Sequence, residues 1–210
     1  MRLGIFGGTF NPIHSGHLRT AEEARYILGL DKVIFVPSGN PPLKEHDTVA
    51  ASHRYAMVGL AIASNKDFIV SDLEAGKLGK SYTVDTLQML HKKYRGDEIF
   101  FILGIDAFLD MPKWRQPEKL VGSTDFIIVA RPGFGFNAIA ESPYMLSLNS
   151  PEGTYTRCSL VGGRSAFLVL VTQLDISSTG IRRLIGQKMS VKYLLPVSVE
   201  RYIRKNKLYS

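Results

Sequence analysis

The chain has 210 residues, of which 45% are hydrophobic and 21% are charged, and its formal net charge is +7. This length and composition predict a soluble protein of one ordinary domain with a sizeable core. No apolar run approaches the ~18 residues that a membrane-spanning helix needs, so we expect no membrane partner.

The single cysteine, Cys158, excludes an intramolecular disulfide and a zinc site held by cysteines. The sequence does not open with a basic stretch followed by an apolar segment, so we expect no signal peptide and predict a cytoplasmic protein. The positive charge is spread out without interleaved aromatic residues, which indicates a solvated face and a site for phosphorylated substrates. Nucleic acid is therefore not the expected partner, although nonspecific binding to it is left open.

A short apolar strand over residues 2–6 leads into a glycine turn and then into a helix over residues 15–28. This arrangement points backbone N–H groups and the positive end of a helix dipole at one place, which suits a phosphate. Glycine lets the backbone approach a ligand closely, and imidazoles can donate hydrogen bonds to phosphate oxygens. The candidate residues are Gly7, Gly8, Thr9, Phe10, His14, Gly16 and His17.

Residues 7–17, Gly-Gly-Thr-Phe-Asn-Pro-Ile-His-Ser-Gly-His, are similar to the signature of the nucleotidyltransferase superfamily, whose phosphate-binding element is a His-x-Gly-His. The long form, with Gly-Gly-x-Phe-x-Pro before the histidines, resembles bacterial nicotinate-nucleotide adenylyltransferases in particular. This resemblance implies that the candidate residues bind ATP, and that His14 and His17 are catalytic.

A continuous apolar run over residues 32–37 predicts a buried parallel strand, and an irregular loop with two prolines follows it. Lys44 in this loop is either a phosphate ligand or a solvated lysine. The resemblance favours binding of the nicotinate nucleotide, but Leu43 occupies the position where the family often has a histidine. Whether His46 replaces that histidine is left open.

Next we expect a helix over residues 51–64, which carries Arg54, and a strand over residues 68–70. Arg54 is either a surface residue or a ligand contact. Thr83 can cap a helix that runs from Val84 to about residue 94. The segment Ser-Tyr-Thr-x-Asp-Thr-Leu resembles the base-binding part of the nicotinate-nucleotide enzymes. This implies that Tyr82, Thr83 and the N–H of Val84 bind the pyridine ring and its carboxylate.

The run over residues 98–104 predicts a strand that is buried on both faces, and it ends at Gly104. Asp106 follows, and it either accepts a hydrogen bond from a ribose hydroxyl of ATP or caps a helix. The only tryptophan, Trp114, would by itself be a core residue. Because the spacing from Gly-x-Asp to Trp resembles the family pattern, the resemblance implies that Trp114 stacks on the pyridine ring and that the Arg115 N–H binds its carboxylate.

A fifth strand is expected over residues 125–130, and Arg131 at its carboxyl end is a candidate for contact with ATP. Residues 134–165 are rich in Gly, Ser, Pro and Asn, and we expect a surface insertion, a hairpin or an oligomer contact there. A last strand is expected over residues 166–171.

The segment Ile-Ser-Ser-Thr-Gly-Ile-Arg begins a helical C-terminal part over about residues 177–210. Hydroxyl residues before a helix make an N-cap whose N–H groups can bind an anion. The segment resembles the second motif of the superfamily, near the ATP triphosphate. This implies ATP binding by Ser177, Ser178, Thr179 and Arg182, with Arg182 also catalytic.

These patterns predict an α/β fold, a Rossmann-like doubly wound parallel sheet with a C-terminal helical segment, in a single domain over residues 1–210. The resemblance implies transfer of AMP from ATP to nicotinate mononucleotide, with Mg²⁺ held through the ATP phosphates and no protein metal site. The alternatives are nicotinamide mononucleotide or phosphopantetheine as the acceptor, or a non-catalytic nucleotide-binding protein. The oligomeric state is open, and a homo-oligomer is compatible with the sequence.

Overall fold

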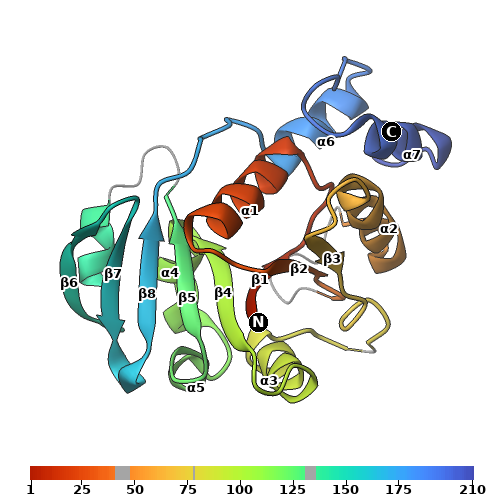
Figure 1. Ribbon diagram of the computed structural model, residues 1–210. Helices are drawn as coiled ribbons and strands as arrows, with labels where there is room; N and C mark the ends of the chain where they lie inside the picture. Colours follow the sequence, from red (N-terminus) through yellow and green to blue (C-terminus); the bar gives the residue numbers. More distant parts are fainter. Residues whose placement is uncertain (41–47, 78, 131–135) are drawn as a thin grey trace. The chain divides into compact units, whose positions relative to one another are not determined.

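The computed structural model describes residues 1–40, 48–77, 79–130 and 136–210 (Figure 1). The strands in these ranges are β1 (Arg2–Gly8), β2 (Lys32–Pro37), β3 (Phe68–Val70), β4 (Glu98–Gly104), β5 (Asp125–Val129), β6 (Met145–Glu152), β7 (Tyr155–Leu160) and β8 (Ser165–Val169). The α-helices are α1 (Ser15–Ile27), α2 (Ala51–Ile62), α3 (Thr83–Lys93), α4 (Ile105–Asp110), α5 (Pro117–Val121), α6 (Ser178–Gly186) and α7 (Val197–Lys205). The same ranges also contain three short 3₁₀ turns: η1 (Met111–Lys113), η2 (Phe136–Glu141) and η3 (Val161–Gly163).

The strands form one sheet in the order β3-β2-β1-β4-β5-β8-β7-β6. The order 3-2-1-4-5 is that of a doubly wound α/β sheet, in which ligands bind beyond the carboxyl ends of the strands. β1 pairs with β4, β4 with β5, and β5 with β8, all in parallel. The predicted α/β class with a mostly parallel sheet is therefore confirmed.

The stretch expected to be an insertion contains the antiparallel strands β6 and β7, and β7 also pairs antiparallel with β8. Figure 1 shows these three strands side by side. Leu146 and Leu148 are exposed on β6, whereas Cys158 and Leu160 are buried on β7. Alternation of apolar and polar residues therefore does not by itself tell which residues of this hairpin are buried.

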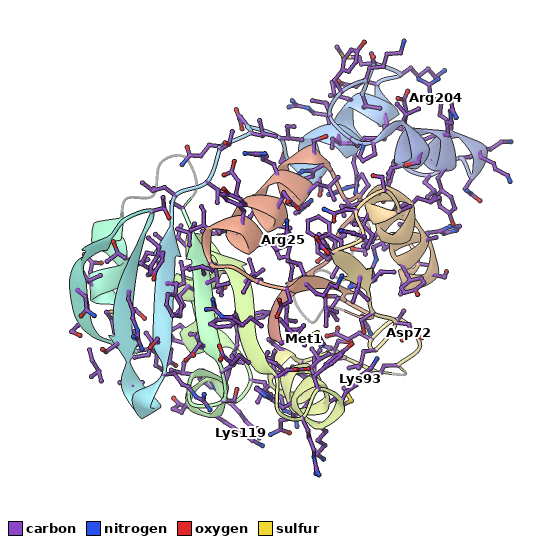
Figure 2. The ribbon with its side chains drawn as sticks, viewed as in Figure 1. Met1, Arg25, Asp72, Lys93, Lys119 and Arg204 are labelled. Atoms are coloured by element: carbon purple, nitrogen blue, oxygen red, sulfur yellow. The ribbon has the colours of Figure 1, made fainter. Side chains whose placement is uncertain are left out.

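The chain divides into two compact units. Unit 1 comprises Met1–Phe6, Thr20–Val33 and Tyr82–Gln173. Its core is formed by strand residues and by the short helices, and it includes edge-to-face contacts of Phe126 with Phe101 and Phe108 at 6.2 and 6.0 Å between ring centroids. Exposed lysines, such as Lys93 at the end of α3 and Lys119 on α5, contribute to the positive charge (Figure 2).

Unit 2 comprises Gly7–Arg19, Ile34–Ser81 and Leu174–Ser210. Phe35 lies at its centre, with ring centroids 5.8 Å from Phe10 and 5.1 Å from Phe68. The predicted helical segment at the end of the chain is present as α6 and α7, and α7 packs along α2. A hydrogen bond of 2.9 Å between His53 Nδ1 and the Tyr202 hydroxyl joins these two helices.

The helices α1, α2 and α3 begin and end within two residues of their predicted bounds. None of the helices within the described ranges is both long and apolar enough to cross a membrane. Residues 41–47, 78 and 131–135 are outside the described residues.

Candidate active site

Residues 7–17, called the cradle below, run from the end of β1 into the first turn of α1. Phe10 adopts a left-handed conformation with φ of 49°. Its ring is 2% exposed and fills the space at Gly8, where a Cβ would lie 3.0 Å from the ring. The room at Gly8 is therefore taken by Phe10, and Phe10 can meet a ligand only through its backbone.

The two predicted histidines lie against each other, with ring centroids 3.7 Å apart. His14 is buried, and His17 is half-buried with the edge of its ring against Phe10 at 5.2 Å. The backbone N–H of His14 donates to His17 Nδ1 at 3.3 Å. A neutral His17 therefore carries its proton on Nε2, which makes Nε2 a hydrogen-bond donor.

The N-terminus of α1 is partly occupied by the chain itself. The backbone N–H of Ser15 donates to the carbonyl oxygen of Leu194 at 2.9 Å, so Ser15 does not offer this donor to a ligand. Gly16 follows, and a Cβ there would lie 3.0 Å from His14 Nδ1. Glycine at position 16 thus gives the His14 ring its place beside the backbone.

The second predicted motif meets the cradle within unit 2. Ser177 is the N-cap of α6, and its hydroxyl accepts a hydrogen bond from the Gly180 N–H at 3.0 Å. The Ser178 hydroxyl donates to the carbonyl oxygen of Pro12 at 2.8 Å, across 166 positions of sequence. Arg182 Nη1 donates to the carbonyl oxygen of Asn11 at 3.0 Å. The two motifs that the sequence predicts to work together are therefore hydrogen-bonded to each other.

A cavity of about 590 Å³ that is broadly open to solvent lies beside this junction. Its lining consists of Thr48, Val49, Thr179, Arg182, Arg183 and Tyr209. Two guanidinium groups give the cavity a positive character that suits an anion. Thr179 is exposed, and its hydroxyl lies 3.5 Å from Arg182 Nη2.

Tyr209 is a contact of the cradle that the sequence analysis missed. Its hydroxyl donates to Asn11 Oδ1 at 2.8 Å, and Val49 N–H donates to the same oxygen at 3.3 Å. Burial raises the pKa of Tyr209, and the charges of Arg182 and Arg54 oppose that rise. Tyr209 is therefore a neutral donor near neutral pH.

Arg54 is neither the surface residue nor the direct ligand contact that the sequence suggests. It is 1% exposed, and it donates to three backbone carbonyl oxygens: those of Val49 at 3.0 Å, Thr9 at 2.8 Å and Gly39 at 2.8 Å. Burial lowers its pKa, although a guanidinium remains protonated in proteins. No local pattern marks such a residue, because its partners come from three segments.

The predicted pyridine-binding residues lie in unit 1. The guanidinium carbon of Arg115 is 4.5 Å from the centroid of the Tyr82 ring, and Arg115 Nη1 is 3.9 Å from Asp85 Oδ2. Trp114, the neighbour of Arg115, is half-buried rather than a core residue. Tyr82 is also half-buried, so both aromatic rings keep accessible surface.

Helix α3 begins one residue earlier than predicted. Its N-cap is Tyr82 in an extended conformation, so the prediction that Thr83 is the cap is wrong. Thr83 and Val84 occupy the first turn, whose N–H groups have no partner within a helix. Val84 itself is 1% exposed, which leaves its backbone as the part that can meet a carboxylate.

Gly104 ends β4 and occupies the N-cap position of α4. Asp106 follows in the first turn and is exposed, so it is not the N-cap that was the alternative to a ribose contact. The remaining predicted residues, Lys44 with its neighbour His46, and Arg131, lie outside the described residues.

The sequence of the chain is similar to those of known proteins. Residues 5–184 match the cytidylyltransferase-like family. Over its whole length the chain is 42% identical to proteins from Geotalea daltonii and Geobacter sulfurreducens, each named "Probable nicotinate-nucleotide adenylyltransferase", and it covers 99% of each. The chain belongs to the nicotinate-nucleotide adenylyltransferases of the cytidylyltransferase-like family.

The fold of this adenylyltransferase is also found in solved structures. Two structures of Plasmodium falciparum nicotinic acid mononucleotide adenylyltransferase, complexed with APC and with NaAD, superpose with TM-scores of 0.72 and 0.74. They share 20% and 21% sequence identity with the chain, which covers 96% and 97% of them. At this identity the likeness concerns the fold, and it confirms the predicted Rossmann-like architecture.

The donor set of the adenylyltransferase cradle suits an anion. The polar groups at the cradle are imidazoles, guanidinium groups and backbone N–H groups, which bind anions. Mg²⁺ instead prefers oxygen ligands. Within the described ranges, no three side chains from His, Cys, Asp and Glu are grouped so that they could hold a metal ion.

Proposed function

We propose that the protein transfers the AMP group of ATP to nicotinate mononucleotide, which yields nicotinic acid adenine dinucleotide and pyrophosphate. A phosphate oxygen of the mononucleotide attacks the α-phosphorus of ATP. The bond between the α-phosphorus and the bridging oxygen breaks, and pyrophosphate leaves with that electron pair. The phosphate is already an anion at neutral pH, so catalysis consists of positioning and charge stabilisation.

One observation carries this proposal: the hydrogen bonds from Ser178 to Pro12 and from Arg182 to Asn11 unite the two phosphate motifs within unit 2. The full-length identity with relatives named nicotinate-nucleotide adenylyltransferase supports the choice of acceptor.

His17 would donate its Nε2–H to a phosphate oxygen of ATP, because its Nδ1 accepts from the His14 N–H at 3.3 Å. His14, stacked on His17, would support the same negative charge as it develops in the transition state. Backbone N–H groups of Gly7, Gly8, Thr9 and Phe10, together with Gly16, are the further donors that we assign to ATP.

Arg182 would neutralise charge on the leaving pyrophosphate, since its guanidinium lines the cavity beside the cradle. The Ser177 side chain caps α6 by accepting a hydrogen bond from the Gly180 N–H. The backbone N–H groups of Ser178 and Thr179, in the first turn of the helix, would bind ATP phosphates. We assign Gly104, Asp106 and Arg131 to the adenosine part of ATP, as the family resemblance implies.

The acceptor would be held by Tyr82 and Trp114, which have accessible aromatic surface for the pyridine ring. First-turn N–H groups of Thr83 and Val84, together with the Arg115 N–H, would bind its carboxylate. Lys44 is assigned to the phosphate of the mononucleotide.

Mg²⁺ would arrive with ATP and stay coordinated by phosphate oxygens, so no step of this account depends on a metal ligand from the protein. We also propose that residues 1–210 act as a single domain and that the protein is cytoplasmic. A homo-oligomer is compatible with the sequence.

The proposal is tested by measuring pyrophosphate release from ATP with nicotinate mononucleotide, nicotinamide mononucleotide and phosphopantetheine in parallel. We expect the fastest release with nicotinate mononucleotide, because backbone N–H groups favour a carboxylate over an amide. Equal or faster release with either other acceptor would contradict the assignment, and no release with any of them would indicate a non-catalytic nucleotide binder.

A further inference from the structure

We propose that Arg54 is a positioning residue of the reaction, which fixes the backbone of the cradle from behind without touching a substrate. This inference rests on the proposed function, since it concerns the same phosphate site. It adds a residue of α2 that belongs to neither sequence motif.

The Arg54 guanidinium is buried and bonded only to the backbone in the contacts that follow. At 1% exposure the side chain cannot reach a ligand, and its three nitrogens each donate to a backbone carbonyl oxygen, at 2.8–3.0 Å. The acceptors are Thr9 in the cradle, Gly39 after β2 and Val49 before α2. A planar guanidinium can hold three acceptors in fixed directions, which a lysine ammonium cannot do in the same way.

The orientation of each carbonyl group decides where the next N–H group points. In a planar trans peptide the C=O and the following N–H point in opposite directions. The carbonyl of Thr9 points toward Arg54, so the N–H of Phe10 points away from it. The carbonyl groups of Gly39 and Val49 also point toward Arg54, so the N–H groups of Asn40 and Ala50 point away from it. Anions are attracted by N–H groups and repelled by carbonyl oxygens, so Arg54 sets the polarity that these segments present on their far side.

Gly39 is held from a second direction. Its N–H lies 3.3 Å from Glu74 Oε2, and a Cβ at this position would lie 2.1 Å from the Glu74 carbonyl oxygen. Glu74 is itself buried, with 6% exposure. The peptide of Gly39 is thus fixed between Arg54 and Glu74, and Arg54 links this fixed point to the cradle through Thr9.

The test compares two variants. Arg54→Met keeps a long side chain but removes the charge and the hydrogen-bond donors, whereas Arg54→Lys keeps the charge but lacks the planar set of guanidinium donors. Arg25→Met is the matched control, because Arg25 pairs with Glu22 at 2.9 Å on α1 and is partly buried. Turnover and ATP affinity are measured well below the melting temperature, with folding checked by circular dichroism.

We expect Arg54→Met to lower kcat/KM for ATP at least tenfold and to weaken ATP binding in calorimetry. Arg54→Lys should give an intermediate loss, and Arg25→Met should stay within twofold of the wild type. A role in stability alone would lower the melting temperature but leave kcat/KM of the folded protein unchanged. That result for both Arg54 variants would overturn the proposal.

If Arg54→Met does not fold, Arg54→Lys decides: reduced kcat/KM with a near-native melting temperature supports the proposal, and wild-type kinetics overturn it. If the wild type shows no turnover with nicotinate mononucleotide, the proposed function has failed. ATP calorimetry then judges Arg54 separately, with weaker binding by the variants as the supporting result and unchanged binding as the contradicting one.

Discussion

The imidazole of His17 is oriented by its neighbours on two sides. The Phe10 ring meets it edge-on at 5.2 Å, and the His14 N–H donates to its Nδ1. This contact leaves the proton of a neutral ring on Nε2, where it can serve a phosphate oxygen. The role that we propose for His17 therefore depends on one atom, Nε2.

Replacing His17 with Ala should lower kcat about 10²–10³-fold, the usual cost of removing one donor to a developing negative charge. The fold should persist, because His17 is only half-buried. Steady-state pyrophosphate release measures the effect, and His91→Asn on α3 serves as the control. Turnover within threefold of the wild type would remove His17 from the catalytic residues.

Trp114 is half-buried, which leaves ring surface for a substrate. We expect Trp114→Ala to raise KM for nicotinate mononucleotide about tenfold and KM for ATP much less, since one base–aromatic stack is worth ~1–3 kcal/mol. Tyr26→Ala is the matched control, because Tyr26 is 82% exposed. Equal increases in both KM values would show that Trp114 does not bind the pyridine ring.

Some residues of the candidate site could be predicted from the sequence and others could not. The cradle and the Ser177–Arg182 segment could be predicted because residue type and spacing lie within one short stretch. Arg54 and Tyr209 could not, because their partners are 45 and 198 positions away at Thr9 and Asn11. Such contacts are created only when the chain folds.

At the scale of elements, the loop after β2 depends on a close approach that only glycine allows. An alanine Cβ at Gly39 would lie 2.1 Å from the carbonyl oxygen of Glu74, which is a backbone atom and cannot rotate away. Gly59 on α2 offers the opposite case, because the nearest atom to its Cβ is Val70 Cγ1 at 3.8 Å.

We therefore expect Gly39→Ala to destabilise the protein by about 1–3 kcal/mol, the usual cost of overpacking. Gly59→Ala should stabilise it by up to ~1 kcal/mol, because alanine is the better helix former. Thermal unfolding measures both, at about 2–4 °C per kcal/mol for a chain of this size. The same melting temperature for the two variants would contradict the close packing at Gly39.

The parallel strands could be predicted because continuous apolar runs such as residues 98–104 are distinctive. For residues 134–165 a hairpin is only one of the expectations and its strands have no predicted bounds, since the leucines of the outer strand, Leu146 and Leu148, are exposed and mark no core face. Its order is set by pairing with β8, which is a tertiary effect that overrides weak local preference.

For the molecule as a whole, acid stability should depend on His91 on α3. Burial lowers the pKa of His91 below its ordinary value of 6.5, and the charge of Arg164 lowers it further. The unfolded chain therefore binds a proton at a higher pH than the folded protein does. Stability should be full above pH 6.5 and should fall as the pH drops below that value.

This prediction is checked by melting temperatures between pH 5 and 7.5. The wild type should lose stability more steeply on acidification than His91→Gln, whose side chain cannot titrate. Parallel curves for the two proteins would mean that His91 does not contribute to the pH dependence.

Transfer of the whole AMP group from ATP is the reaction that we propose for the cradle and α6. The most direct measurement incubates the protein with nicotinate mononucleotide and ATP labelled at the α-phosphorus. We expect the label to appear in the dinucleotide and the pyrophosphate to be unlabelled, with one of each formed per ATP consumed. Label that stays in ATP, or that appears in free AMP without dinucleotide, would contradict it.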